Sequence, residues 1–196
     1  MRRTAALLAL ATAVAMVILE RPLASYIHRT LYSPRLGRWA DGFFFVLLVL
    51  GAALALLLLG LGLIALRRRP LRPWMATLMA SSAAGLAALL LSEAAKFLIG
   101  RTPVYPTFLV DGVSGFAPFH LGSFPSSTAA TTAAVGGVLW EEWPRGRPVY
   151  AIVLLVICAA ILVVNAHWLS DVLAGILLGM TMASISRQKG LSSSHR

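Results

Sequence analysis

The sequence predicts an all-α, polytopic membrane protein with six transmembrane helices, and three observations of the whole chain lead to this prediction. Of 196 residues, 59% are hydrophobic and only 12% are charged, whereas an average soluble domain carries about 25% charged residues. The apolar residues form long runs, and the 17 Lys and Arg, against 7 Asp and Glu, fall mostly between those runs. The length fits a single transmembrane domain, residues 1–186, with a short polar tail at 187–196.

Six apolar runs are candidates for membrane helices, which need about 20 mostly apolar residues each. In chain order they are residues 5–19, 43–66, 74–91, 127–140, 149–164 and 172–184. The fourth is the weakest in hydropathy because it is rich in Ala, Thr and Gly. The first also fits a cleaved signal peptide, but Glu20-Arg21-Pro22 is not a small-residue cleavage site, so we expect the run to be retained.

The positions of the cations predict the orientation. With a cytoplasmic amino terminus, 11 of the 17 lie on the cytoplasmic side: Arg2, Arg3, Arg67, Arg68, Arg69, Arg72, Arg145, Arg147, Arg187, Lys189 and Arg196. The positive-inside rule therefore explains the net charge of +10. We expect both termini in the cytoplasm, in a bacterial inner membrane. No basic face or arm of the kind that binds nucleic acid is evident, so no such partner is predicted.

Ionisable residues at membrane depth are costly, and each is a candidate for function. Lys96 and Arg101 lie near the end of the third predicted helix, where Gly100 can end the helix and let both cations approach one anion. The alternative is that both side chains extend to lipid headgroups.

The segment Pro125-Ser126-Ser127-Thr128 predicts the start of the fourth helix, with Ser126 or Ser127 as the N-cap. Free backbone N–H groups and the helix dipole suit such a start to phosphate binding. Many helices begin in this way and bind nothing, so an ordinary helix start is the alternative.

His167 and Asp171 are four residues apart, so on one helical turn they would share a face. The carboxylate could then accept a hydrogen bond from the imidazole, fix its tautomer and leave the other ring nitrogen to attack. A metal site would need further ligands at suitable spacing, and the sequence offers none. No metal or cofactor is therefore predicted, although a purely structural pair remains an alternative.

These three segments together resemble a known family. Lys96 with Gly-Arg-Thr-Pro, then Phe-Pro-Ser-Ser-Thr, then Ala-His-Trp-Leu-Ser-Asp-Val-Leu-Ala-Gly are similar to the three motifs of the type-2 phosphatidic acid phosphatase and haloperoxidase-like superfamily. The resemblance covers about residues 74–179. It implies a lipid-phosphatase-type helical bundle that works without metal through a phosphohistidine. It also implies the following residues: His167 as nucleophile, Asp171 as its orienting carboxylate, and Lys96, Arg101, Ser126, Ser127 and Thr128 at the phosphate.

Three positions depart from the family motifs. Pro103 stands where the first motif has its Arg, which leaves only Arg101 to serve. Thr128 stands in place of the general-acid histidine of the second motif, and Ile161 in place of the Arg of the third. His120, in the preceding outer loop, is a candidate substitute for the missing acid, or else an ordinary surface histidine.

The sequence therefore predicts a lipid phosphatase or phosphotransferase with its site on the outer face of the membrane. Its substrate would be a lipid phosphate or diphosphate, such as a phosphatidate-like lipid or a polyprenyl diphosphate. The alternative is a catalytically impaired homologue that binds lipid phosphate or a membrane-protein partner. A transporter is less favoured, because no paired broken helices are evident in matching halves. The oligomeric state stays open, because Gly136 and Gly137 permit close packing within one chain or between two.

Overall fold

The computed structural model describes residues 2–31, 33–66, 72–104, 118–120 and 122–193. All regular elements in these ranges are helical, which confirms the all-α prediction for the part of the chain they cover. In order they are α1 (Arg2–Val14), a π-helical turn (Ala15–Leu19), α2 (Glu20–Thr30), α3 (Pro34–Leu66), α4 (Pro73–Ile99), α6 (Ser127–Glu142), a 3-10 turn (Pro144–Gly146), α7 (Arg147–Val163) and α8 (Leu169–Ser193).

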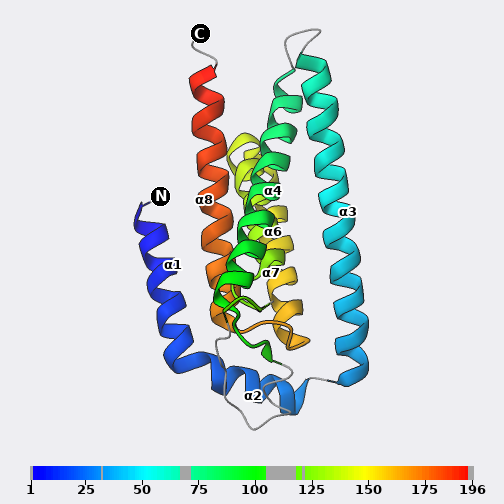
Figure 1. Cartoon of the computed structure of the whole chain (residues 1–196). Coiled ribbons are helices and arrows are strands. Elements are labelled where there is room, and N and C mark those ends of the chain that lie inside the picture. The colour runs from blue at the N-terminus through cyan, green and yellow to red at the C-terminus, as the bar shows by residue number, and fades with distance from the viewer. Residues whose placement is uncertain (1, 32, 67–71, 105–117, 121, 194–196) are drawn as a thin grey trace.

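The helices α4, α6, α7 and α8 form the bundle, with α1 and α3 on either side of it (Figure 1). The helix α2 lies across one end, where α4 ends and α8 begins. The carboxyl terminus of the chain lies at the opposite end. Every residue discussed below as part of the candidate site comes from the end that α2 crosses.

Small residues hold the centre of the bundle together. The helix α6 packs between α4 and α8. Their shared apolar cluster consists of Ala84, Ala88, Ala130, Ala134, Val138 and Ala183. Gly179 permits the closest approach, since a Cβ there would lie 2.2 Å from the carbonyl oxygen of Ala130. The Ala and Gly residues that make α6 weak in hydropathy also let the backbones of α4, α6 and α8 approach one another.

Four stretches among the described residues are long and apolar enough to cross a membrane: Ala6–Thr30, Pro73–Ile99, Pro144–Val163 and Leu169–Ser186. They support an integral membrane protein. The helix α6 has 16 residues, and the apolar stretch Gly51–Ile64 inside α3 is also short. The predicted count of six spans is therefore not confirmed.

Two other sequence predictions concern the carboxyl-terminal tail and the cations between the apolar runs. The helix α8 continues to Ser193, so the tail predicted to begin at residue 187 starts as part of a helix. Arg67, Arg68, Arg69 and Arg196, used in the charge argument, lie outside the described residues.

Candidate active site

The turn after α4 separates Lys96 from Arg101, the two cations predicted to bind phosphate. Gly100 adopts the left-handed conformation, with φ 60° and ψ 42°, which Gly tolerates better than other residues. Its N–H donates to the carbonyl oxygen of Lys96, at 2.8 Å, and closes the helix. Lys96 therefore projects from the last turn, whereas Arg101 follows the change of direction and contacts a different set of residues.

Lys96 lies beside the start of α6. Its Nζ donates to Ser127 Oγ and to Glu93 Oε1, each at 2.8 Å. The side chain of Lys96 is 14% exposed and that of Glu93 is 41% exposed. Ser126 caps the helix by accepting from the N–H of Ala129 at 3.4 Å. A cation, a hydroxyl and a helix amino terminus thus lie together, the combination that suits an anion.

His167 and Asp171 lie at the start of α8, but not on one helical turn. Asn165 turns the chain with a φ of 53°, and α8 begins only at Leu169, so His167 precedes it. Asp171 Oδ2 accepts from the N–H of Trp168, at 3.0 Å. This is the half of a capping box in which the side chain of the third helical residue accepts from the N–H of the N-cap residue, here Trp168. The helix start therefore fixes the Asp171 carboxylate independently of the histidine.

The imidazole of His167 lies close to that carboxylate without a hydrogen bond to it. His167 Nδ1 is 3.5 Å from Asp171 Oδ2, and the histidine side chain is 13% exposed. Nδ1 itself is buried and has no hydrogen-bond partner among the described residues. Catalytic hydrogen bonds are often long without substrate and tighten when it binds.

Arg101 is at the centre of a buried ion-pair network. Its side chain is 1% exposed. Nη1 lies 2.5 Å from Asp171 Oδ1 and 2.7 Å from Ser170 Oγ, and Nη2 lies 2.6 Å from Glu20 Oε1. The Ser170 hydroxyl donates to Glu20 Oε2, also at 2.6 Å. The observed partners of this guanidinium are therefore two carboxylates and a hydroxyl.

Backbone contacts join the starts of α6 and α8. The N–H of Ser126 donates to the carbonyl oxygen of Asp171 at 3.0 Å. Gly175, one turn after Asp171 in α8, lies so close to Ser126 that a Cβ there would be 2.5 Å from the serine carbonyl oxygen. The serine segment and the His-Asp segment are thus held as one unit.

Thr128 and His120 have fewer ties to this unit. Thr128 is half-buried in the first turn of α6. His120 is exposed, and its Nδ1 lies 3.3 Å from the carbonyl oxygen of Pro118. The adjacent Phe119 N–H donates to the carbonyl oxygen of Phe97, which places this turn near the end of α4. No contact between His120 and His167 is found among the described residues.

Ile161, which stands in place of the Arg of the third family motif, has apolar surroundings. Ile161 is buried in a cluster with Ala129, Cys158 and Val172. An Arg there would bring an unpaired charge into this cluster, at a large cost. The isoleucine at position 161 therefore fits the apolar side chains around it.

Glu20 and Ser170 were not predicted as site residues. In the sequence, Glu20 directly follows the first apolar run and Ser170 lies within the third motif. A carboxylate that directly follows an apolar membrane run is a functional signal on its own. That signal could have identified Glu20, but nothing in the sequence indicated its partner. In the described part of the chain, no three His, Cys, Asp or Glu side chains are grouped as a metal site would require.

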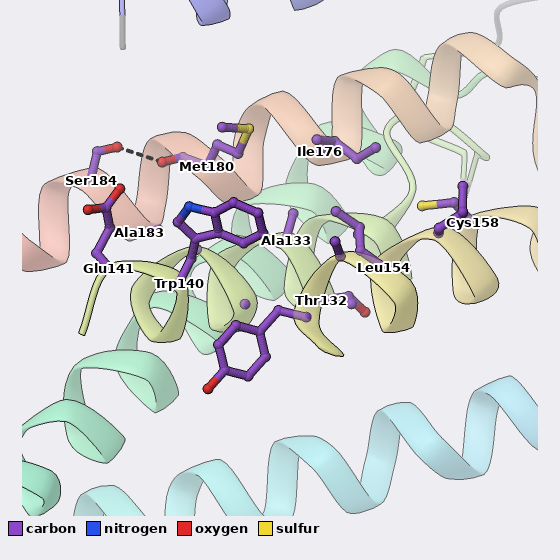
Figure 2. Close-up of a pocket in the computed structure, with 15 residues that line it drawn as sticks. Thr132, Ala133, Trp140, Glu141, Leu154, Cys158, Ile176, Met180, Ala183 and Ser184 are labelled. Carbon is purple, nitrogen blue, oxygen red and sulfur yellow. Dashed lines mark hydrogen bonds between the residues drawn. The ribbon is translucent and has the colours of Figure 1, made fainter. Parts of the chain in front are cut away.

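A cavity of about 500 Å³ lies between α6, α7 and α8, farther from α2 than the candidate site and toward the carboxyl-terminal end of the bundle. Figure 2 shows Trp140, Leu154 and Met180 around it, with Ile176 and Cys158 toward one end. Leu154, Cys158 and Ile176 also pack in the apolar cluster that contains Ile161. This cluster includes residues adjacent to the starts of α6 and α8, so apolar side chains separate the cavity from the candidate site.

Two of three comparisons relate the chain to known proteins. The family model described as PAP2 superfamily matches residues 74–190. No curated protein sequence matches the chain. A similar solved structure is described as the first transmembrane PAP2 type phosphatidylglycerolphosphate phosphatase from Bacillus subtilis. It is 18% identical with a TM-score of 0.53, over 98% of this chain and 97% of that one. At this identity the likeness concerns the fold, and it agrees with a transmembrane helical bundle.

Proposed function

The chain belongs to the PAP2 superfamily, and on that premise we propose that it is a membrane lipid phosphatase or phosphotransferase that works through His167. The single observation that carries the proposal is the His167–Asp171 pair. A buried, unpartnered Nδ1 faces a fixed carboxylate oxygen at 3.5 Å. A small movement of the ring forms the Nδ1–H···Oδ2 bond, which leaves Nε2 as the nucleophile.

In the proposed reaction, Nε2 attacks the phosphorus of a lipid phosphate or diphosphate. An N–P bond forms, the P–O bond to the lipid or to its inner phosphate breaks, and the leaving oxygen keeps the bonding electron pair. Water or another acceptor then attacks phosphorus, the N–P bond breaks, and free histidine is restored. Asp171 stabilises the positive charge of the phosphorylated imidazole while Nδ1 keeps its proton.

We assign the phosphate to Lys96 and to the α6 start at Ser126, Ser127 and Thr128. Support comes from the Lys96–Ser127 contact of 2.8 Å and from the backbone N–H groups of the first helical turn. Arg101 contributes in a different way from the one implied by the resemblance. Because it is 1% exposed and contacts two carboxylates, we propose that it acts on the site by holding Asp171.

A diphosphate lipid is the favoured substrate class. Thr128 stands in the place of the family's acid histidine, and a phosphate leaves without a general acid more readily than an alkoxide does. We propose that His120 supplies a proton when the leaving group needs one. Comparable cleavage of mono- and diphosphate lipids, together with unchanged turnover in His120→Ala, would count against both statements.

The charge arrangement supports the proposed orientation in a bacterial inner membrane. The candidate site lies at the end of the bundle opposite the carboxyl terminus (Figure 1). If the cation-rich ends lie in the cytoplasm, the site faces the periplasm.

A second candidate function is lipid-phosphate binding without turnover. Glu20, Glu93 and Asp171 outnumber Lys96 and Arg101 in and beside the site. The surplus negative charge disfavours a phosphate dianion unless His167 is protonated. A protonated His167 could bind the anion but could not attack it.

The test is phosphate release by purified protein from a panel of phosphatidate, phosphatidylglycerol phosphate and polyprenyl diphosphate. We expect release by the wild type and by the matched control His195→Ala, and none by His167→Ala. Equal release by His167→Ala would overturn the proposal. Retention of a labelled lipid with no release from any of the three would favour the binding protein.

A further inference from the structure

Glu20 occupies a position that carboxylates rarely occupy. It is the first residue of α2, directly after the π-helical turn Ala15–Leu19, and it is 4% exposed. Burying a carboxylate is costly unless it is paired and hydrogen-bonded. Glu20 meets this condition only through residues far away in the sequence.

Both oxygens of Glu20 have partners. Oε1 accepts from Arg101 Nη2 and Oε2 accepts from the Ser170 hydroxyl, each at 2.6 Å. These partners follow Glu20 by 81 and 150 residues. The contacts therefore tie the amino-terminal segment to the end of α4 and to the first turn of α8, one residue before Asp171.

Glu20 determines how Arg101 uses its two terminal nitrogens. Nη2 is directed to Glu20 Oε1, and Nη1 contacts Asp171 at Oδ1. Asp171 Oδ2 is left for the Trp168 N–H and for His167 Nδ1. Arginine commonly binds a single carboxylate through both oxygens. With Glu20 neutralised, that arrangement would bring Arg101 onto Asp171 Oδ2.

We propose that Glu20 is a positioning residue for the His167–Asp171 pair. It divides the Arg101 guanidinium between two carboxylates and thereby reserves Asp171 Oδ2 for the imidazole. This inference rests on the proposed function for its kinetic consequence, but not for its effect on the imidazole itself.

The net charge of the network supports the same conclusion. Glu20 and Asp171 together exceed Arg101 by one negative charge. The imidazole gains a positive charge when Nε2 bonds to phosphorus, and a buried negative neighbour stabilises that charge. Glu20 is thus expected to affect the chemical step rather than substrate binding.

The kinetic test uses Glu20→Gln, which removes the charge at nearly constant shape, with Glu142→Gln at the far end of α6 as the matched control. We expect kcat to fall about 10- to 100-fold in Glu20→Gln, by analogy with the loss of a residue that orients a metal-bound histidine. KM should stay near the wild-type value. Glu20→Asp, which keeps the charge, should recover part of the loss, and Glu142→Gln should match the wild type.

A second measurement does not depend on enzyme activity. Diethyl pyrocarbonate modifies nucleophilic imidazoles, and peptide mass spectrometry gives the rate at each histidine. We expect Glu20→Gln to slow modification at His167 several-fold, with no change at His120 as the internal reference. The same result in a protein that releases no phosphate would refute the proposed function but support this inference.

Unchanged kcat and unchanged His167 modification in folded Glu20→Gln would overturn the inference. Parallel changes at His167 and His120, with a lower unfolding midpoint, would do so too, because they indicate a purely structural contribution. If Glu20→Gln does not fold, Ser170→Ala replaces it, since it removes the hydroxyl bonded to Glu20 Oε2 and no charge. The effects should then have the same direction and a smaller size, and their absence would be equally decisive.

Discussion

The starts of α6 and α8 lie side by side, and each receives a cation from the end of α4. At α6, Lys96 contacts a hydroxyl and a 41%-exposed carboxylate from its own helix. At α8, Arg101 is almost fully buried and contacts two carboxylates from distant parts of the chain. The two cations lie five residues apart in the sequence but have different surroundings.

The difference in burial indicates which of the two cations can leave its ion-pair partner for a ligand. The Lys96–Glu93 pair is partly exposed through Glu93 and so contributes less to stability than a buried pair, which lets Lys96 leave Glu93 for a phosphate at lower cost. A buried pair leaves an uncompensated charge when one partner is removed. Arg101 is therefore suited to hold the carboxylates around it in place, and Lys96 is suited to bind a ligand.

The largest effect is expected from removal of Arg101. Arg101→Leu leaves Glu20 and Asp171 buried without their cation, which should reduce stability by about 3–5 kcal/mol. Thermal unfolding in detergent would measure this as a marked fall in the midpoint. Arg145→Leu, at an exposed position at the other end, is the control. Equal midpoints for the two variants would contradict the distinction between the two helix starts.

Removal of Lys96 should affect activity rather than folding. Lys96→Gln keeps a side chain that can bond Ser127 but removes the charge, so kcat/KM should fall about 10²- to 10³-fold, as on loss of one anion-stabilising donor. The unfolding midpoint should stay near the wild-type value. A midpoint as low as that of Arg101→Leu would show that Lys96 is also a structural residue.

The sequence predicted the surroundings of Lys96 better than those of Arg101. The sequence indicated a cation at a helix end and a hydroxyl-rich helix start as separate anion-binding features, and the structure brings Lys96 and Ser127 together. The spacing of His167 and Asp171 predicted that they lie close, but on one helical turn, whereas in the structure α8 begins only at Leu169 and Asp171 reaches back over the helix start to the N–H of Trp168. The pairing of Arg101 with Glu20 joins residues 81 positions apart. Local periodicity does not encode such a contact, because it depends on how α2 crosses the bundle.

The fold, like the site, was predictable in part: the helices that face lipid gave a clear signal and α6 did not. Long apolar runs identified Pro73–Ile99 and Leu169–Ser186 because lipid-facing residues must be apolar along the whole span. The helix α6 gave a weak signal because its Ala and Gly face other helices instead of lipid. Hydropathy measures what a helix presents to its solvent, so a helix packed between two others is the hardest to recognise.

The contact between the two starts is the next target. In Gly175→Ala the new Cβ would lie 2.5 Å from the Ser126 carbonyl oxygen, and overpacking of this kind costs about 1–3 kcal/mol. We expect a lower unfolding midpoint and lower activity together, since both starts must move. Gly136→Ala is the matched control, because the nearest atom to its Cβ would be at 3.9 Å. Equal midpoints for the two variants would mean that the starts are not held by this contact.

The smallest effect should separate the two serines at the α6 start. Ser126 caps the helix through the N–H of Ala129 at 3.4 Å, and loss of an N-cap typically costs about 0.5–2 kcal/mol. Ser126→Ala should therefore lower the unfolding midpoint slightly. Ser127→Ala removes only the contact with Lys96, so it should leave the midpoint unchanged and raise KM for the lipid phosphate. If the two serines exchange these effects, Ser127 is the structural residue and the α6 start, like that of α8, is fixed before any ligand arrives.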